Sequence, residues 1–79
     1  MSEDSVRSIL SKHGRLTADV DSLENDNDLY NAGLTSLATV GLMLALEDEF
    51  DIEFPDSMLS RKTFSSIEAI TEAIEELQD

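Results

Sequence analysis

Apolar residues recur at the three- and four-residue spacing of an α-helix in three segments of the chain. These segments predict helices over about Glu3–His13, Ser36–Phe50 and Ser66–Leu77. Pro55 followed by Asp56 is typical of a helix start, and predicts a further short helix over about Asp56–Arg61. Ser65 and Glu68 have the spacing of a capping box at the start of the last helix. The pattern therefore predicts four helices.

A strand is the competing interpretation for only one stretch. Phe50, Ile52 and Phe54 alternate with acidic residues, as they would on a half-buried strand. No partner strand is evident elsewhere, and an isolated strand is not stable. We therefore predict an all-α protein, a four-helix bundle with a long first loop and a short third helix. The 79 residues are expected to form a single domain, residues 1–79.

Residues 15–34 are polar and acidic, yet apolar side chains recur among them. A structureless loop of this length is unusual in a compact domain and is often functional or packed across the core. We predict a long crossover held down by its five apolar residues, which are Leu16, Val20, Leu23, Leu29 and Leu34.

The predicted helix over Ser36–Phe50 carries two apolar stripes. One contains Leu42, Ala45, Leu46 and Phe50, and is widened by Thr39 and Met43. The other contains Leu37, Val40 and Leu44 at helical spacing. One stripe can face the core of a small bundle. The second is expected to be partly exposed as a partner-binding surface, unless the helix is central and both stripes are buried.

The charge of the chain narrows the range of partners. There are 18 acidic residues against 5 Lys and Arg, which gives a net charge of −13. Such a field repels nucleic acid and anionic membranes, and steers basic protein surfaces toward the chain. The sequence has no cysteine, no apolar signal segment and no run long enough to cross a bilayer. We expect a cytoplasmic protein that binds neither nucleic acid nor membrane.

Ser36 differs from the other serines in its surroundings. A serine at a helix start is usually the cap, but Thr35 can cap this helix as well. If Thr35 is the cap, Ser36 lies at the first helical position with a free hydroxyl. A phosphate ester is favoured there by free backbone N–H groups and the helix dipole. Gly33 allows a tight turn just before it. These features predict a modified serine.

Two other kinds of chemistry fit the residues poorly. Gly33-x-x-Ser36 is not the G-x-S-x-G turn of a hydrolase, and His13, the one histidine, has no positional relation to Ser36. The acidic run from Asp19 to Asp28 lacks the ligand spacing of a calcium-binding EF-hand loop. We therefore expect neither a catalytic residue nor a metal site.

The residues resemble the acyl carrier protein family across essentially the whole chain. The resemblance rests on Asp28-Leu29-Tyr30-x-x-Gly33-Leu34-x-Ser36-Leu37, on Leu42-x-x-Ala45-Leu46-Glu47-x-x-Phe50-x-Ile52-x-Phe54-Pro55, and on Phe64-x-x-Ile67-x-x-Ile70. It implies a non-enzymatic carrier with 4′-phosphopantetheine, donated by coenzyme A, attached to Ser36. An acyl or aminoacyl cargo would be held as a thioester on the thiol of that arm.

The resemblance also implies a set of partner enzymes. These are a phosphopantetheinyl transferase, an acyl- or amino acid-activating ligase, and a downstream acyltransferase or synthase. They would dock on a face made of Thr35, Leu37, Val40, Gly41, Leu44, Glu47 and Asp48. A surface that binds many partners should not be buried in a dimer interface, so we expect a monomer.

The chain departs from the family pattern at Thr35, where aspartate is usual, and at Ala38 and Gly41, where fatty-acid carriers tend to have acids. These departures favour a dedicated carrier, with an aminoacyl cargo, over the housekeeping fatty-acid carrier. An acyl cavity would be lined by Leu42, Met43, Leu46, Leu59, Ile67 and Ala73. The alternative function is an unmodified acidic adaptor that binds a partner through the exposed stripe alone.

Overall fold

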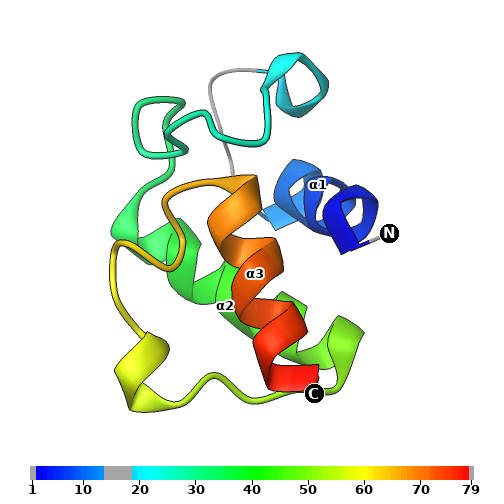
Figure 1. Cartoon of the computed structure of the whole chain (residues 1–79). Helices are drawn as coiled ribbons and strands as arrows, with labels where there is room; N and C mark the ends of the chain where they lie inside the picture. Colours follow the sequence, from blue (N-terminus) through cyan, green and yellow to red (C-terminus); the bar gives the residue numbers. More distant parts are fainter. Residues whose placement is uncertain (1, 14–18, 79) are drawn as a thin grey trace.

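The computed structural model describes residues 2–13 and 19–78. This part of the chain forms three α-helices and no strand: α1 (Ser2–His13), α2 (Ser36–Phe50) and α3 (Ile67–Gln78) (Figure 1). The prediction of an all-α fold is confirmed. The predicted bounds of α2 are the observed ones, α1 begins one residue earlier than predicted and ends as predicted, and α3 is displaced by one residue at both ends.

The predicted four-helix count is not confirmed. Where a short helix was expected over Asp56–Arg61, the structure has a single 3₁₀ turn, Asp56–Met58. The amides of Met58 and Leu59 donate to carbonyls three residues back, Pro55 O and Asp56 O, at 2.8 and 3.1 Å. Beginning a helix fixes several residues for one hydrogen bond, so a single turn rarely extends without tertiary packing. None of the residues of this turn is fully buried, although Met58 packs against the core, and Leu59 caps the turn at its end.

The core lies where α1 packs against both α2 and α3. Each helix contributes its apolar stripe, and the loops before and after α2 add further side chains. The buried apolar residues are Val6, Ile9, Leu10, Val20, Leu29, Ala32, Leu34, Leu42, Leu46, Phe54, Phe64, Ile67, Ile70, Ala73 and Ile74. This arrangement holds α2 against α1 by one side and leaves its first turn at the surface.

The long segment before α2 crosses the bundle as predicted. Val20, Leu29 and Leu34 are buried and Leu23 is half-buried, while Leu16 lies outside the described residues. A 3₁₀ turn, Val20–Ser22, is its one helical element in the described part. The segment is therefore packed on the core through apolar side chains.

Hydrogen bonds also fasten this crossover to α1 and α3. Arg7 of α1 donates to Val20 O and to Asn25 Oδ1, both at 2.8 Å. The carbonyl of Asn25 in turn accepts the amide of Glu68 at 2.9 Å. The crossover thus lies across the start of α3.

The capping residue of α3 is Ser66 and not Ser65. Ser66 Oγ accepts the amide of Ala69 at 3.0 Å, while Ser65 Oγ donates to Lys62 O at 2.7 Å. Because α3 begins at Ile67, the serine directly before it has the geometry to cap, and the capping-box prediction was wrong by one residue.

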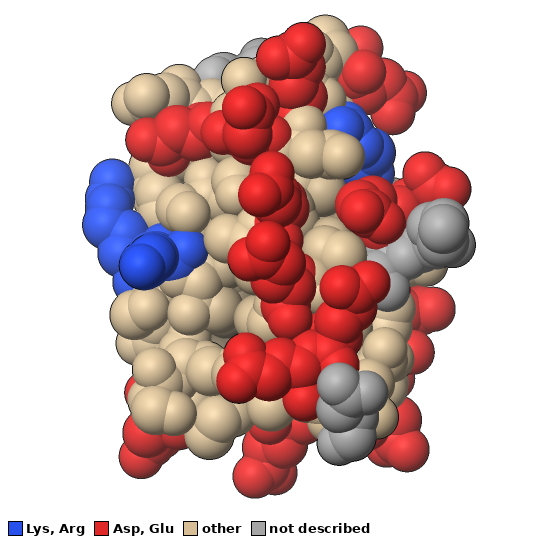
Figure 2. All heavy atoms as spheres, viewed as in Figure 1, with Lys and Arg blue, Asp and Glu red and all other residues tan. Residues whose placement is uncertain are grey.

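Acidic side chains cover much of one face of the molecule. Figure 2 shows them as a ridge that follows the exposed side of α3, which carries Glu68, Glu72, Glu75 and Glu76. In the same view one group of Lys and Arg side chains lies at the left edge, beside a neutral surface, and further blue atoms lie among acidic side chains at the upper right. None of the described helices is long and apolar enough to cross a membrane.

Candidate functional site

The start of α2 is capped by Thr35, one of the two residues that the sequence left open for this role. Thr35 Oγ1 accepts the amide of Ala38 at 3.0 Å, and Thr35 O accepts both the amide and the hydroxyl of Thr39, at 2.9 and 2.7 Å. Thr35 has the extended backbone that an N-cap requires, with φ −97° and ψ 163°. The capping role is therefore filled without Ser36.

Ser36 is exposed at the first position of α2. Within the described residues, its hydroxyl makes no hydrogen bond, and the amides of Ser36 and Leu37 have no acceptor. Unpaired amides at a helix start, together with the dipole, stabilise a negative charge. A phosphodiester on Ser36 would meet this partial positive charge, so the site is chemically suited to phosphopantetheine.

A tight turn directs the chain into α2. The amide of Leu34 donates to Leu29 O at 3.0 Å and that of Gly33 to Tyr30 O at 3.2 Å. Gly33 has φ 112°, a conformation that side-chain-bearing residues rarely adopt. Leu34 is then buried, and Ser36 emerges two residues later at the surface.

The two stripes of α2 separate as predicted. Leu42 and Leu46 are fully buried, whereas Leu37, Val40 and Leu44 are 85%, 52% and 56% exposed. Exposed apolar side chains grouped along one helix face are typical of a protein-binding surface. Within the described residues nothing covers this stripe, so the helix is not buried on both sides.

Three further residues of the predicted partner face differ in their environments. Asp48 is exposed, but Glu47 is half-buried and its Oε2 accepts the amide of Phe54 at 2.9 Å. Glu47 therefore fastens the segment that follows α2, a structural contact that its sequence position does not indicate. A Cβ added to Gly41 would meet nothing within 4 Å among the described residues, so no described neighbouring backbone requires glycine there.

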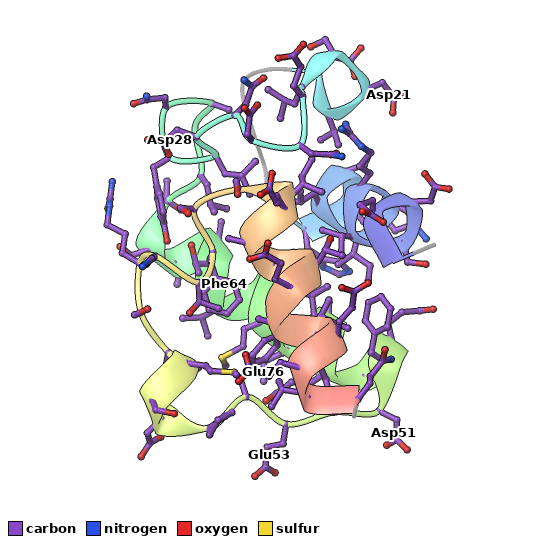
Figure 3. All side chains as sticks on the ribbon, viewed as in Figure 1. Asp21, Asp28, Asp51, Glu53, Phe64 and Glu76 are labelled. Carbon is purple, nitrogen blue, oxygen red and sulfur yellow. The ribbon has the colours of Figure 1, made fainter. Side chains whose placement is uncertain are left out.

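A shallow hollow lies beside Ser36, but its lining is not the predicted one. Of the expected lining residues only Met43 and Leu59 border it, because Leu42, Leu46, Ile67 and Ala73 are buried in the core. The hollow lies instead between α2 and the loop before α3, and Phe64, labelled in Figure 3, lies on its loop side. The residues that line it are Tyr30, Ser36, Thr39, Val40, Met43, Leu59, Ser60, Arg61 and Phe64.

His13, for which the sequence indicated no relation to Ser36, is exposed at the end of α1 and lies near part of the predicted partner face. Together with Lys12 it borders a second hollow, whose other wall is formed by Thr35, Leu37 and Gly41. The packing of α1 on α2 brings them together, and sequence spacing alone does not reveal such a contact. His13 does not share a hollow with Ser36.

Comparison with known proteins places these features in a family. Residues 5–74 match the family model described as a phosphopantetheine attachment site. An aminoacyl carrier protein from Agrobacterium fabrum is 50% identical over 74 residues, which cover 94% of this chain and 89% of that protein.

Two solved structures share the fold. One belongs to a crystal structure of an engineered Bradyrhizobium japonicum glycine:[carrier protein] ligase complexed with carrier protein from Agrobacterium tumefaciens and ATP. The match has a TM-score of 0.93 and 47% identity, and covers 96% of this chain and 99% of that one. The other, a holo acyl carrier protein from Nitrosomonas europaea, matches with a TM-score of 0.84 and 28% identity, over 96% of this chain and 94% of that one.

The family model covers most of the chain, and a relative with half of its residues identical spans nearly all of it. The protein therefore belongs to the phosphopantetheine-attachment family of carrier proteins, which bear 4′-phosphopantetheine and are not themselves catalysts.

Proposed function

We propose that this protein carries an aminoacyl group as a thioester on 4′-phosphopantetheine attached to Ser36, and presents it to partner enzymes. The observation that carries the proposal is the state of Ser36 at the start of α2. It is exposed, it makes no hydrogen bond within the described residues, and Thr35 fills the capping role beside it. A hydroxyl that the fold does not use is available for modification.

The attachment step requires only a hydroxyl from this chain. Ser36 Oγ would lose its proton and form a bond to the phosphorus of coenzyme A that bears the pantetheine. The pyrophosphate bond of coenzyme A would break, and adenosine 3′,5′-bisphosphate would leave. The unpaired amides of Ser36 and Leu37 favour the phosphodiester that remains. A phosphopantetheinyl transferase would supply the catalysis.

An aminoacyl cargo is favoured by the relatives and by the site. The aminoacyl carrier protein of Agrobacterium fabrum is 50% identical, and a chain 47% identical occurs in a complex with a glycine:[carrier protein] ligase. The expected acyl cavity is filled by core side chains, with Leu42, Leu46 and Ile67 fully buried. A small aminoacyl group needs no such cavity, because it can remain on the arm in solvent.

The loading partner in this proposal is an amino acid-activating ligase, and the acceptor is a downstream acyltransferase or synthase. They would dock on the α2 face, defined by Thr35, Leu37, Val40, Gly41, Leu44, Glu47 and Asp48. The exposed apolar stripe would bury against the partner, while Asp48 would meet its basic residues. We propose that the protein acts as one domain, as a monomer, in the cytoplasm.

The attachment is tested by intact mass spectrometry after incubation with coenzyme A and a broad-specificity phosphopantetheinyl transferase. The parent should gain one phosphopantetheine, and Ser36→Ala should gain none. Ser66→Ala is the matched control, because Ser66 is also a serine at a helix start but its hydroxyl caps α3. It should be modified like the parent.

Loading is tested next on the holo protein, with glycine, ATP and a glycine:[carrier protein] ligase. A further mass gain that hydroxylamine removes would identify an aminoacyl thioester. Absence of phosphopantetheine on a folded, previously unmodified parent would overturn the carrier proposal and favour an acidic adaptor. Attachment without loading by several amino acid ligases would overturn the aminoacyl cargo alone.

The docking face is tested by ligase kinetics with variants of the holo protein. Leu44→Gln should raise the KM for the carrier by about fivefold to tenfold, as expected for an apolar side chain buried in an interface. Asp48→Asn should raise it by about threefold. Asp56→Asn removes another exposed charge, one that is not part of α2, and should leave the KM unchanged. Equal effects of the two aspartate variants would contradict docking on α2.

A further inference from the structure

The hollow beside Ser36 is mostly apolar and has a volume of about 320 Å³. One wall is the exposed side of α2, where Thr39, Val40 and Met43 follow Ser36. The other wall is the loop that leads to α3, with Leu59 and Phe64. The hollow thus starts at the candidate attachment residue and is bounded by side chains that could contact a short apolar segment.

Arg61 stands on the loop side of this hollow and is held there by Tyr30. The guanidinium carbon of Arg61 lies 3.8 Å from the centre of the Tyr30 ring. The Tyr30 hydroxyl donates to Arg61 O at 3.1 Å. Tyr30 is itself fixed by Asp28, whose Oδ1 accepts the Tyr30 amide at 2.9 Å. An exposed arginine is therefore restrained at both its backbone and its side chain.

The charge of Arg61 has no carboxylate partner among the described residues, although the chain carries 18 acidic residues. A guanidinium stays protonated and offers five N–H donors. Contact with a ring face uses none of these donors in a hydrogen bond. Figure 2 shows a group of Lys and Arg side chains at the left edge of the molecule, below a group of acidic side chains and beside a neutral surface. Arg61 therefore offers, next to the hollow, a cation without a carboxylate partner in the described part of the chain.

We propose that Arg61, held on Tyr30, binds the phosphodiester attached to Ser36, so that the first part of the arm lies in the hollow. The inference rests on the proposed function, since it requires the arm. Ser36 and Arg61 line the same hollow, and a phosphodiester is the one charged group of the arm near its attachment point. The guanidinium can donate two parallel hydrogen bonds to its oxygens.

The same charge would act differently on the cargo. The free amino group of an aminoacyl thioester is a cation, and the guanidinium repels it. Arg61 therefore favours the phosphate end of the arm in the hollow and the amino end in solvent, where a partner enzyme can reach it.

The test is a comparison of apo and holo spectra of the ¹⁵N-labelled protein. In the parent, attachment should shift the amide resonances of Ser60, Arg61 and Phe64, which are far from Ser36 in sequence but line the hollow. In Arg61→Gln these shifts should fall by about threefold, as for the loss of one exposed charged contact. Lys62→Gln is the matched control, because it removes a neighbouring exposed charge that does not line the hollow, and it should behave like the parent.

A second measurement avoids any effect of substitution on folding. Raising the salt from about 0.02 to about 0.5 M should reduce the same shifts in the holo parent, because salt screens an exposed charge pair. Shifts confined to the first turn of α2, or equal shifts in Arg61→Gln and the parent, would overturn the inference while the measured mass still supports the carrier. Absence of attachment by mass would overturn the proposed function, and the inference with it.

Discussion

The starts of α2 and α3 are capped in the same way, but within the described residues only the start of α3 is also hydrogen-bonded to another segment of the chain. In each, a hydroxyl residue accepts the amide three positions on: Thr35 from Ala38 and Ser66 from Ala69, both at 3.0 Å. In α3 the amide of the preceding residue, Glu68, also has an acceptor, because it donates to Asn25 O of the crossover at 2.9 Å. The equivalent amide in α2 belongs to Leu37, and it has no acceptor within the described residues.

This difference explains how two serines at helix starts can have different roles. The hydroxyl of Ser66 is needed by α3, and the crossover covers that end of the helix. The hydroxyl of Ser36 is not needed by α2, and the helix end beside it stays exposed. A site for an anionic modification requires both conditions, because unpaired amides favour the charge and a free hydroxyl accepts the group.

The largest expected loss of stability follows from changing the turn that directs the chain into α2. Gly33→Ala forces a residue with a Cβ to adopt φ 112°. We expect the free energy of unfolding to fall by roughly 1–3 kcal/mol, measured by urea denaturation. Gly41→Ala is the control, because its added Cβ meets nothing within 4 Å and the helix propensity improves. A loss as large in Gly41→Ala would contradict the assignment of strain to Gly33.

The second prediction concerns the hydrogen bonds that hold the crossover over the start of α3. Arg7→Gln removes the donors to Val20 O and Asn25 Oδ1, which hold the crossover over the start of α3. We expect a loss of about 1–2 kcal/mol, since one of the two bonds is partly buried. Amide hydrogen exchange should also speed up at Glu68, whose amide donates to Asn25 O. Unchanged exchange at Glu68 would mean that Arg7 is not what holds the crossover there.

The cap of α3 itself should contribute less. Ser66→Ala leaves the amide of Ala69 without its acceptor and should cost about 1 kcal/mol. Ser65→Ala is the matched control, because Ser65 Oγ instead donates to Lys62 O. If Ser65→Ala instead lowered the free energy of unfolding more than Ser66→Ala in denaturant titrations, Ser65 would be the cap of α3, as the capping box in the sequence predicts.

The part of the site that sequence could predict is local in the chain. Gly33, Thr35 and Ser36 lie within four residues, so turn, cap and free hydroxyl follow from their own chemistry and spacing. The two stripes of α2 follow from helical periodicity in the same way, and the exposed fractions confirm them. Consecutive hydroxyl residues leave the choice of cap open, at Thr35 and Ser36 as at Ser65 and Ser66, and only the observed helix starts distinguish them.

The remaining features depend on tertiary contacts that spacing does not encode. Arg61 lies on Tyr30, 31 positions away, and the loop places both beside Ser36. His13 borders a hollow with Leu37 because α1 packs on α2. Glu47 was expected on the partner face for its charge, but its carboxylate also accepts the Phe54 amide. The short helix expected after Pro55 is a single turn, none of whose residues is buried, although Met58 packs against the core from the side.

The smallest expected change in stability is the most informative for the comparison. Ser36→Ala removes a hydroxyl that makes no hydrogen bond within the described residues, while Thr35 continues to cap α2. We expect the free energy of unfolding of the apo protein to change by less than about 0.5 kcal/mol, since the substitution is at an exposed site and alanine is the better helix former. Thr35→Ala at the adjacent position should cost about 1 kcal/mol in the same titration, because the Ala38 amide loses its acceptor. A serine that can be removed without cost is free to serve as an attachment point. If Ser36→Ala were instead as costly as Thr35→Ala, then Ser36 would be contributing to the cap, and the contrast between the two helix starts would fail.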